Sequence, residues 1–239
     1  RITKKTIDLG SKYSPDFVCV PFKYNLGNFL ESLEQGANVI LQAGGGCRYG
    51  YYPEVQEKIL KDLGYEFELY SLVNHDKMTP RSIYQTFKKI DSRIPLYKML
   101  YYIPLTILMI RYMDNIDNYI RLNIGFEIEK NSFINLKKEM LDQFYHCHGY
   151  LSLTKLYFRY KKKFKNIKVN KPKNCLRVGI IGELYTAMEP FSSYFLEKEL
   201  ANMNIEIKRF TNVSYLLYQK RLHRKSNLHY IEIYCKWNI

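Results

Sequence analysis

The sequence lacks a long apolar run, a regular cysteine framework and an N-terminal signal peptide. Its most apolar stretch, residues 99–110, lies between Lys98 and Arg111 and contains Pro104, whereas a membrane-spanning helix needs roughly 20 apolar residues. We therefore expect a buried helix there and no membrane span. The five cysteines are irregularly spaced, which is not typical of a secreted disulfide scaffold, so we expect a cytoplasmic protein.

The common catalytic signatures are also missing. There is no HExxH zinc motif, no Ser-His-Asp or Cys-His order with supporting context, and no paired-carboxylate pattern above background. The three glycines at 44–46 match neither a Walker loop nor the GxGxxG fingerprint. Cys147 lies between two histidines, but such adjacent spacing is not a usual metal-ligand pattern. The candidate functional features are therefore charged segments and turns that match no standard motif.

The excess positive charge is confined to two segments. The 239 residues carry a formal net charge of +14. Residues 151–175 hold nine Lys or Arg and residues 208–228 hold six, with no acid in either segment. Together these segments carry +15, so the rest of the chain is almost neutral. The overall charge therefore does not argue for a nucleic-acid partner.

The first basic segment has an apolar stripe at helical spacing. Its members are Leu153, Leu156, Tyr157, Tyr160 and Phe164. We interpret the lysines on the other side as a solvated helix face, and the alternative is a phosphate-binding strip with interleaved aromatic rings.

Strand-like and helix-like segments alternate near both ends of the chain, which predicts an α/β fold with parallel sheets. The predicted strands are residues 16–20, 37–42, 66–72, 176–181 and 205–210, with 176–181 buried. The predicted helices are residues 23–35, 53–63, 80–90, 95–113, 129–145, 150–166 and 190–203. We expect a first α/β lobe at 1–78, a helical region at 79–170 and the start of a second lobe at 171–239.

The turns from strand to helix hold the candidate functional residues. In an open parallel sheet such turns meet at one edge, where ligands bind. Cys19 and Cys47 lie at or just before helix N-termini, where the helix dipole favours a thiolate. Gly44, Gly45 and Gly46 would let the backbone approach a bulky group closely, and Arg48 follows them. Glu183, in the third turn, is a weak candidate for acid–base catalysis or a simple helix cap.

Three ordered motifs resemble those of the acyl-CoA dehydratase activase-related proteins, which belong with the 2-hydroxyacyl-CoA dehydratase and benzoyl-CoA reductase subunits. The motifs are KYSPDFVCVPFK at 12–23, GGGCRYGYY at 44–52, and RVGIIGELY at 177–185 followed by EPF at 189–191. The resemblance covers most of residues 2–70 and 173–210, and the helical middle only loosely.

The resemblance implies two Rossmann-like α/β lobes, the second incomplete, joined by a helical region. It also implies a [4Fe–4S] or related cluster held by thiolates at Cys19 and Cys47. In the dehydratases an ATP-dependent activase transfers one electron to the cluster, and the electron passes to a 2-hydroxyacyl-CoA thioester. The implied function is low-potential electron transfer or radical dehydration of a CoA thioester, with the activase and a second dehydratase-like subunit as partners.

The family pattern also contains a Gly-Gly-His-type segment and a further cysteine that this sequence lacks. We therefore expect a truncated or degenerate member whose cluster site is incomplete in this chain, or a site that another chain completes. Two alternatives stay open from the residues themselves. One is a cluster-free α/β module that binds the phosphate of CoA or a nucleotide through Gly44–Gly46 and the lysine-rich helix. The other is an inactive homologue that only associates with a partner.

Overall fold

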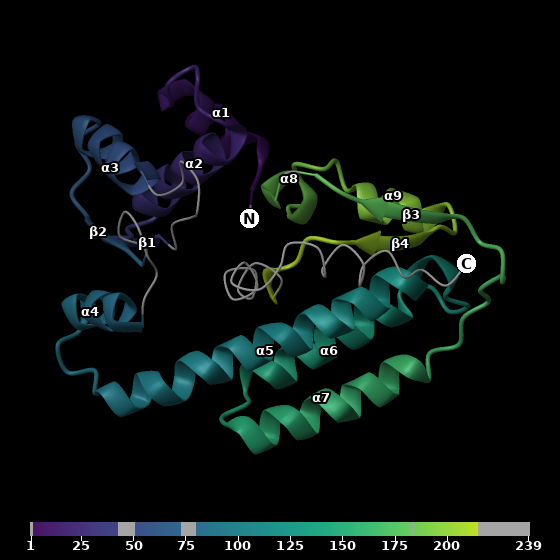
Figure 1. Ribbon diagram of the computed structural model, residues 1–239. Helices are drawn as coiled ribbons and strands as arrows, with labels where there is room; N and C mark the ends of the chain where they lie inside the picture. Colours follow the sequence, from purple (N-terminus) through teal and green to yellow (C-terminus); the bar gives the residue numbers. More distant parts are fainter. Residues whose placement is uncertain (1, 43–50, 73–79, 183, 215–239) are drawn as a thin grey trace, which may run out of the picture. The chain divides into compact units, whose positions relative to one another are not determined.

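The structure, a computed structural model, describes residues 2–42, 51–72, 80–182 and 184–214 (Figure 1). Over these residues the fold is mixed α/β and mostly helical, with two small parallel sheets of two strands each. The chain divides into two compact units, Arg1–Tyr101 and Tyr102–Ile239. Among the described helices, none combines the length and apolar character needed to cross a membrane.

The first unit contains a β–α–β motif preceded by two helices. Its elements are α1 (Lys4–Tyr13), α2 (Val20–Glu34), β1 (Val39–Gln42), α3 (Tyr52–Asp62), β2 (Glu68–Ser71), α4 (Pro80–Ile90) and the start of α5 (Leu96–Asn123). β1 and β2 pair in parallel, with Val39 opposite Glu68 and Gln42 opposite Ser71. The strands predicted at 37–42 and 66–72, and the helix between them, are confirmed.

The prediction of a strand at residues 16–20 is wrong. The chain turns at residues 16–17, Cys19 is the N-cap of α2, and Val20 is its first helical residue. Pro21 explains the difference, because its fixed φ suits the first turn of a helix while its missing N–H would interrupt a sheet. Phe17, which gave the segment its apolar character, is 88% exposed.

Helix α1 was not expected from the sequence, and Gly10 near its end is a poor helix former. The structure gives the reason for this glycine. A Cβ at Gly10 would lie 1.8 Å from the carbonyl oxygen of Lys23, and one at Gly27 would lie 1.9 Å from the carbonyl oxygen of Thr6. The two glycines therefore let the backbones of α1 and α2 touch. The N-terminus of α1 is closed by a capping box between Thr3 and Thr6.

The core of the first unit lies between α2, α3 and β1. Its buried side chains are Phe22, Leu26, Leu30, Leu33, Ile40, Tyr52 and Leu60. α2 supplies four of them at helical spacing, so its apolar face covers the sheet. Helix α3 ends at Asp62, and Gly64 follows with φ +88°, as expected for a glycine that closes a helix.

The second unit joins long helices to a second parallel strand pair. After α5 its elements are the 3₁₀ helix η2 (Ile124–Phe126), α6 (Ser132–Tyr145), α7 (Tyr150–Lys165), β3 (Arg177–Ile180), α8 (Leu184–Met188), α9 (Leu196–Asn202) and β4 (Glu206–Arg209). β3 and β4 pair in parallel, with Arg177 opposite Glu206 and Ile180 opposite Arg209.

Helices α5, α6 and α7 lie side by side and share one apolar core (Figure 1). Tyr112 of α5 stacks on Tyr157 of α7 with ring centroids 3.9 Å apart. The predicted stripe of α7 is confirmed, because Leu153, Tyr157, Tyr160 and Phe164 are all buried. The stripe fixes which face of α7 is turned inward, and the lysines project on the opposite face.

Three predictions about the apolar and helical segments need correction. Residues 99–110 form part of α5, but only Met99 and Leu105 are buried, whereas Leu100 is 66% exposed. The strand predicted at 176–181 is present but not buried, since Ile181 is 83% exposed. The helix predicted at 190–203 begins only at Leu196, because residues 190–195 form turns. In the first two segments, local hydrophobicity exceeded the packing surface that the fold provides. In the third, Tyr194 and Phe195 have positive φ angles, which a continuous α-helix does not allow.

Candidate functional site

Cys19 occupies the N-terminal end of α2, as its sequence position predicts. It is exposed, and its extended backbone (φ −71°, ψ 159°) makes it the N-cap residue of a 15-residue helix. Its thiol lies within hydrogen-bond reach of the hydroxyl of Tyr52, the first residue of α3. The N-termini of α2 and α3 therefore meet at this cysteine.

A chain of buried amides holds these helix starts to the end of β1. Gln42 Nε2 donates to Gln56 Oε1 at 3.2 Å, and Gln56 Nε2 donates to the carbonyl oxygen of Phe22 at 3.2 Å. The rings of Phe22 and Tyr52 pack edge to face with centroids 4.9 Å apart. Because Gln56 is fully buried, this chain links β1, α3 and the first turn of α2 in a fixed arrangement.

Gln42 contributes a further feature to this edge of the sheet. Its Oε1 is buried and has no hydrogen-bond partner among the residues that the structure describes. Gln42 is the last residue of β1, directly before the glycine-rich turn in the sequence. A buried acceptor of this kind favours a donor N–H close by.

Most of the other predicted site residues lie outside the described residues. These are Gly44, Gly45, Gly46, Cys47, Arg48 and Glu183. The convergence of Cys19 with Cys47 therefore stays a prediction. Within the described ranges, no group of three or more His, Cys, Asp or Glu side chains could hold a metal ion.

The remaining described cysteines make separate polar contacts within the second unit. Cys147 Sγ lies 3.1 Å from Ser152 Oγ, and Cys175 Sγ donates to Glu206 Oε2 at 3.8 Å. Both are only partly exposed. Each of these two thiols therefore has a side-chain partner, and Cys235 lies outside the described residues.

The lysine-rich face of α7 forms local pairs. Lys163 Nζ and Tyr160 Oη both donate to Glu139 Oε1, at 2.7 and 2.9 Å. Burial, followed by the bond to Glu139, raises the pKa of Tyr160 to about 12. The Lys163 ammonium holds the pKa of the Glu139 carboxyl below its ordinary value. These contacts, together with the buried stripe, agree with a solvated helix face that is anchored to α6.

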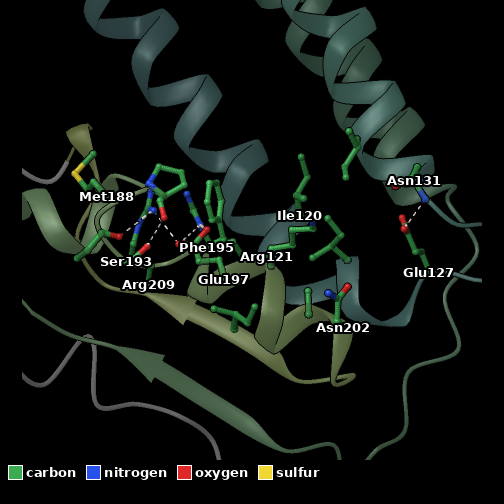
Figure 2. A pocket seen from close by; sticks show the side chains of 17 residues that line it. Ile120, Arg121, Glu127, Asn131, Met188, Ser193, Phe195, Glu197, Asn202 and Arg209 are labelled. Carbon is green, nitrogen blue, oxygen red and sulfur yellow. Dashed lines mark hydrogen bonds and ion pairs between the residues drawn. The ribbon is translucent and has the colours of Figure 1, made fainter. Parts of the chain in front are cut away.

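Sequence reasoning missed a cavity in the second unit. It has a volume of about 470 Å³ and lies between α5, α9, β4 and the turns before α9 (Figure 2). Arg121 Nε donates to both carboxylate oxygens of Glu197, at 3.2 and 3.1 Å, and Arg209 Nη1 donates to Glu197 Oε1 at 2.8 Å. One carboxylate thus bridges two guanidinium groups in the cavity wall.

Both arginines of this cluster are largely withdrawn from water. Their side chains are 10% and 9% exposed, whereas that of Glu197 is 33% exposed. Burial, followed by the nearby charge of Arg121, lowers the pKa of Arg209. In the sequence these residues lie on three separate elements without a shared motif. The only signal was the basic character of 208–228, which does not indicate the partners of Arg209.

Comparison with known proteins identifies no relative of this chain. No protein-family model, no curated protein and no solved structure matches the chain significantly.

Proposed function

We propose that this chain is an iron–sulfur protein related to 2-hydroxyacyl-CoA dehydratase components. Its role would be low-potential electron transfer or radical dehydration of a CoA thioester. Cys19 and Cys47 are the proposed thiolate ligands of a [4Fe–4S] cluster, and the two parallel strand pairs are the proposed beginnings of Rossmann-like lobes. The proposed partners are an ATP-dependent activase and a second dehydratase-like subunit.

The position of the Cys19 thiol carries the proposal. It is exposed at the N-terminus of α2, where an iron atom can approach it, and cysteine binds iron as a thiolate. It also contacts Tyr52, which follows the glycine-rich turn containing Cys47 by only a few residues in the sequence. The buried chain from Gln42 to Phe22 would hold this thiol in place as a ligand approaches.

The described residues provide only one candidate ligand, Cys19, for such a cluster. Cys19 is a free and exposed cysteine, but a cluster needs about four ligands, and the described residues around Cys19 supply no group of three donors. The proposal therefore requires Cys47 and ligands from another chain. When bound, the cluster would supply one-electron transfer, while the residues described here bind and orient it.

Anaerobic reconstitution of the full chain with iron and sulfide tests the proposal. We expect the parent protein to bind iron and to absorb broadly at about 400 nm through sulfur-to-iron charge transfer. Cys19→Ala and Cys47→Ala should each lose most of this iron. Cys147→Ala is the matched control, because Cys147 is a cysteine outside the proposed site, and it should keep the parental iron content.

Two outcomes contradict the proposal. One is a folded parent protein that takes up no iron and shows no such absorbance. The other is parental iron content in Cys19→Ala and Cys47→Ala. Far-ultraviolet circular dichroism of each variant separates loss of a ligand from loss of the fold.

A further inference from the structure

The Arg121–Glu197–Arg209 cluster has more positive charge than its own carboxylate can balance. Two guanidinium groups share Glu197. Asp114 and Asp117 also act electrostatically on Arg209, but Asp117 pairs with Lys137 at 2.6 Å and Asp114 accepts the backbone N–H of Ser214 at 2.7 Å. Among the described residues, Glu197 is therefore the carboxylate in direct contact with these two poorly hydrated cations.

Each arginine also keeps donors that the protein does not use. Arg121 donates through Nε to Glu197 and through Nη1 to Asn118 Oδ1, at 2.9 Å. Arg209 donates through Nε to the carbonyl of Thr211 and through Nη1 to Glu197. Neither Nη2 atom has a hydrogen-bond partner among the described residues. Neither is among the fully buried polar atoms that lack a partner in those residues. Both Nη2 atoms therefore keep some accessible surface.

The other acid in the cavity wall, Glu127, is hydrogen-bonded to donors other than the two arginines. Glu127 accepts the backbone N–H groups of Asn131 and Phe133 and the hydroxyl of Ser132, so it caps the start of α6. Figure 2 shows Glu127 and Asn131 apart from the arginine cluster. Lys198, which is exposed, adds a further cation to the wall. The cavity wall therefore carries three cations and two carboxylates, and of these carboxylates only Glu197 contacts the arginines.

The rest of the cavity is mainly apolar. Its wall includes Ile120, Ile124, Ile134, Met188, Phe195 and Ile207. A volume of about 470 Å³ is typical of small-molecule sites, which combine an apolar lining with a few fixed polar groups. An occupant of matching chemistry has an apolar body and one anionic end.

We propose that this cavity binds a small organic carboxylate, with its carboxylate at Nη2 of Arg121 and Arg209 and its apolar body along the isoleucines and Phe195. A carboxylate suits the site because planar guanidinium groups donate to its two oxygens in pairs. A second carboxylate also suits two guanidinium groups that share the single carboxylate of Glu197. The site is independent of the proposed cluster at Cys19, because it requires no cysteine.

Titration calorimetry with octanoate tests the proposal on the full-length parent protein. Octanoate should bind with saturation, whereas octanol, which lacks the charge, and acetate, which lacks the apolar body, should each bind at least about tenfold more weakly. These comparisons need no variant. Octanol binding as tightly as octanoate would overturn the assignment, as would the absence of octanoate binding. Octyl phosphate binding more tightly than octanoate would overturn the choice of a carboxylate head.

Two arginine variants locate the site. Arg209→Met should weaken octanoate binding by about tenfold or more, because it removes a charge-assisted donor. Arg159→Met is the matched control, since Arg159 is exposed on α7 and does not line the cavity, and it should leave the affinity within about twofold. Equal affinity in Arg209→Met and the parent would exclude this cavity as the site.

A conservative variant and a spectroscopic readout guard against loss of the fold. Arg209→Lys keeps the charge and should bind octanoate more tightly than Arg209→Met but more weakly than the parent. The ¹³C resonance of carboxyl-labelled octanoate should shift on binding to the parent and to Arg159→Met. An identical shift with Arg209→Met would show that the carboxylate does not meet this cluster and would overturn the proposal.

Discussion

The two units bury polar networks of different kinds beside their parallel strands. In the first unit the network is neutral and consists of the Gln42 and Gln56 amides with the Phe22 carbonyl. In the second unit it is ionic and consists of Arg121, Glu197 and Arg209. A neutral network needs no counter-ion and can only position its neighbours. An ionic network with two cations and one anion also retains an attraction for an added anion.

The two networks should therefore respond differently when a central residue is removed. Loss of a buried charge partner costs more than loss of a buried neutral hydrogen bond, because an isolated charge is more expensive to keep out of water. A smaller effect is expected for Tyr160, a buried phenol whose hydroxyl donates to the carboxylate of Glu139. Three measurements of the unfolding free energy rank these cases.

The largest effect is expected for Glu197→Ala. This change leaves two guanidinium groups, 10% and 9% exposed, without their shared carboxylate. We expect a loss of about 3 kcal/mol in the free energy of unfolding, measured by urea denaturation. Glu199→Ala, an exposed position on the same helix, should change it by less than about 0.5 kcal/mol. Equal losses in the two variants would show that the ion cluster contributes little to stability.

An intermediate effect is expected for Gln56→Ala in the first unit. The change removes both hydrogen bonds of a fully buried amide, leaves Gln42 Nε2 unpaired and takes the side-chain donor from the Phe22 carbonyl. We expect a loss of about 2 kcal/mol, smaller than for Glu197→Ala because no charge is stranded. Lys58→Ala, on the exposed face of the same helix, should cost only about 0.3 kcal/mol. A loss larger than that of Glu197→Ala would reverse the ranking.

The smallest effect is expected at high pH from Tyr160. Its folded pKa is raised to about 12 from an ordinary value of 10.0, chiefly by burial. Between these values the unfolded chain releases the phenolic proton while the folded chain keeps it, so the unfolding free energy falls as pH rises. Below pH 10 this contribution is fully present.

Tyr160→Phe removes this titration and should make the alkaline loss of stability shallower, by at most about 2 kcal/mol. The measurement is urea unfolding at about pH 8 and about pH 11, on either side of the ordinary phenolic pKa. Tyr145→Phe, at a side chain that is 83% exposed, should leave the pH dependence unchanged. Parallel alkaline profiles for the parent and Tyr160→Phe would contradict the assignment.

Sequence patterns were reliable where one local signal matched the later packing. The stripe of α7 predicted its buried face, and the parallel strand pairs around β1 and β3 follow from short apolar runs separated by helices. The predictions were wrong where one local pattern is compatible with two different structures. The apolar run before Pro21 became the lead-in to α2, and the run before Ile181 remained exposed.

The candidate sites divide in the same way. Cys19 could be selected in advance because a cysteine beside Pro21 at a helix start is a local feature. Its contact with Tyr52 and the amide chain through Gln56 could not, because they join residues about thirty positions apart. The cavity could not be predicted from the sequence, since Arg121 and Glu197 are separated by 76 positions.

The sequence by itself determined most of the helical and strand segments, the nearly neutral remainder with two basic segments, and the cysteine that caps α2. Periodicity, charge and turn chemistry act over a few residues, so they can be read along the chain. Only the tertiary structure decided which polar groups became buried partners. Burial is what gives Gln56 and Arg209 their roles, and it depends on elements that meet only when the chain folds.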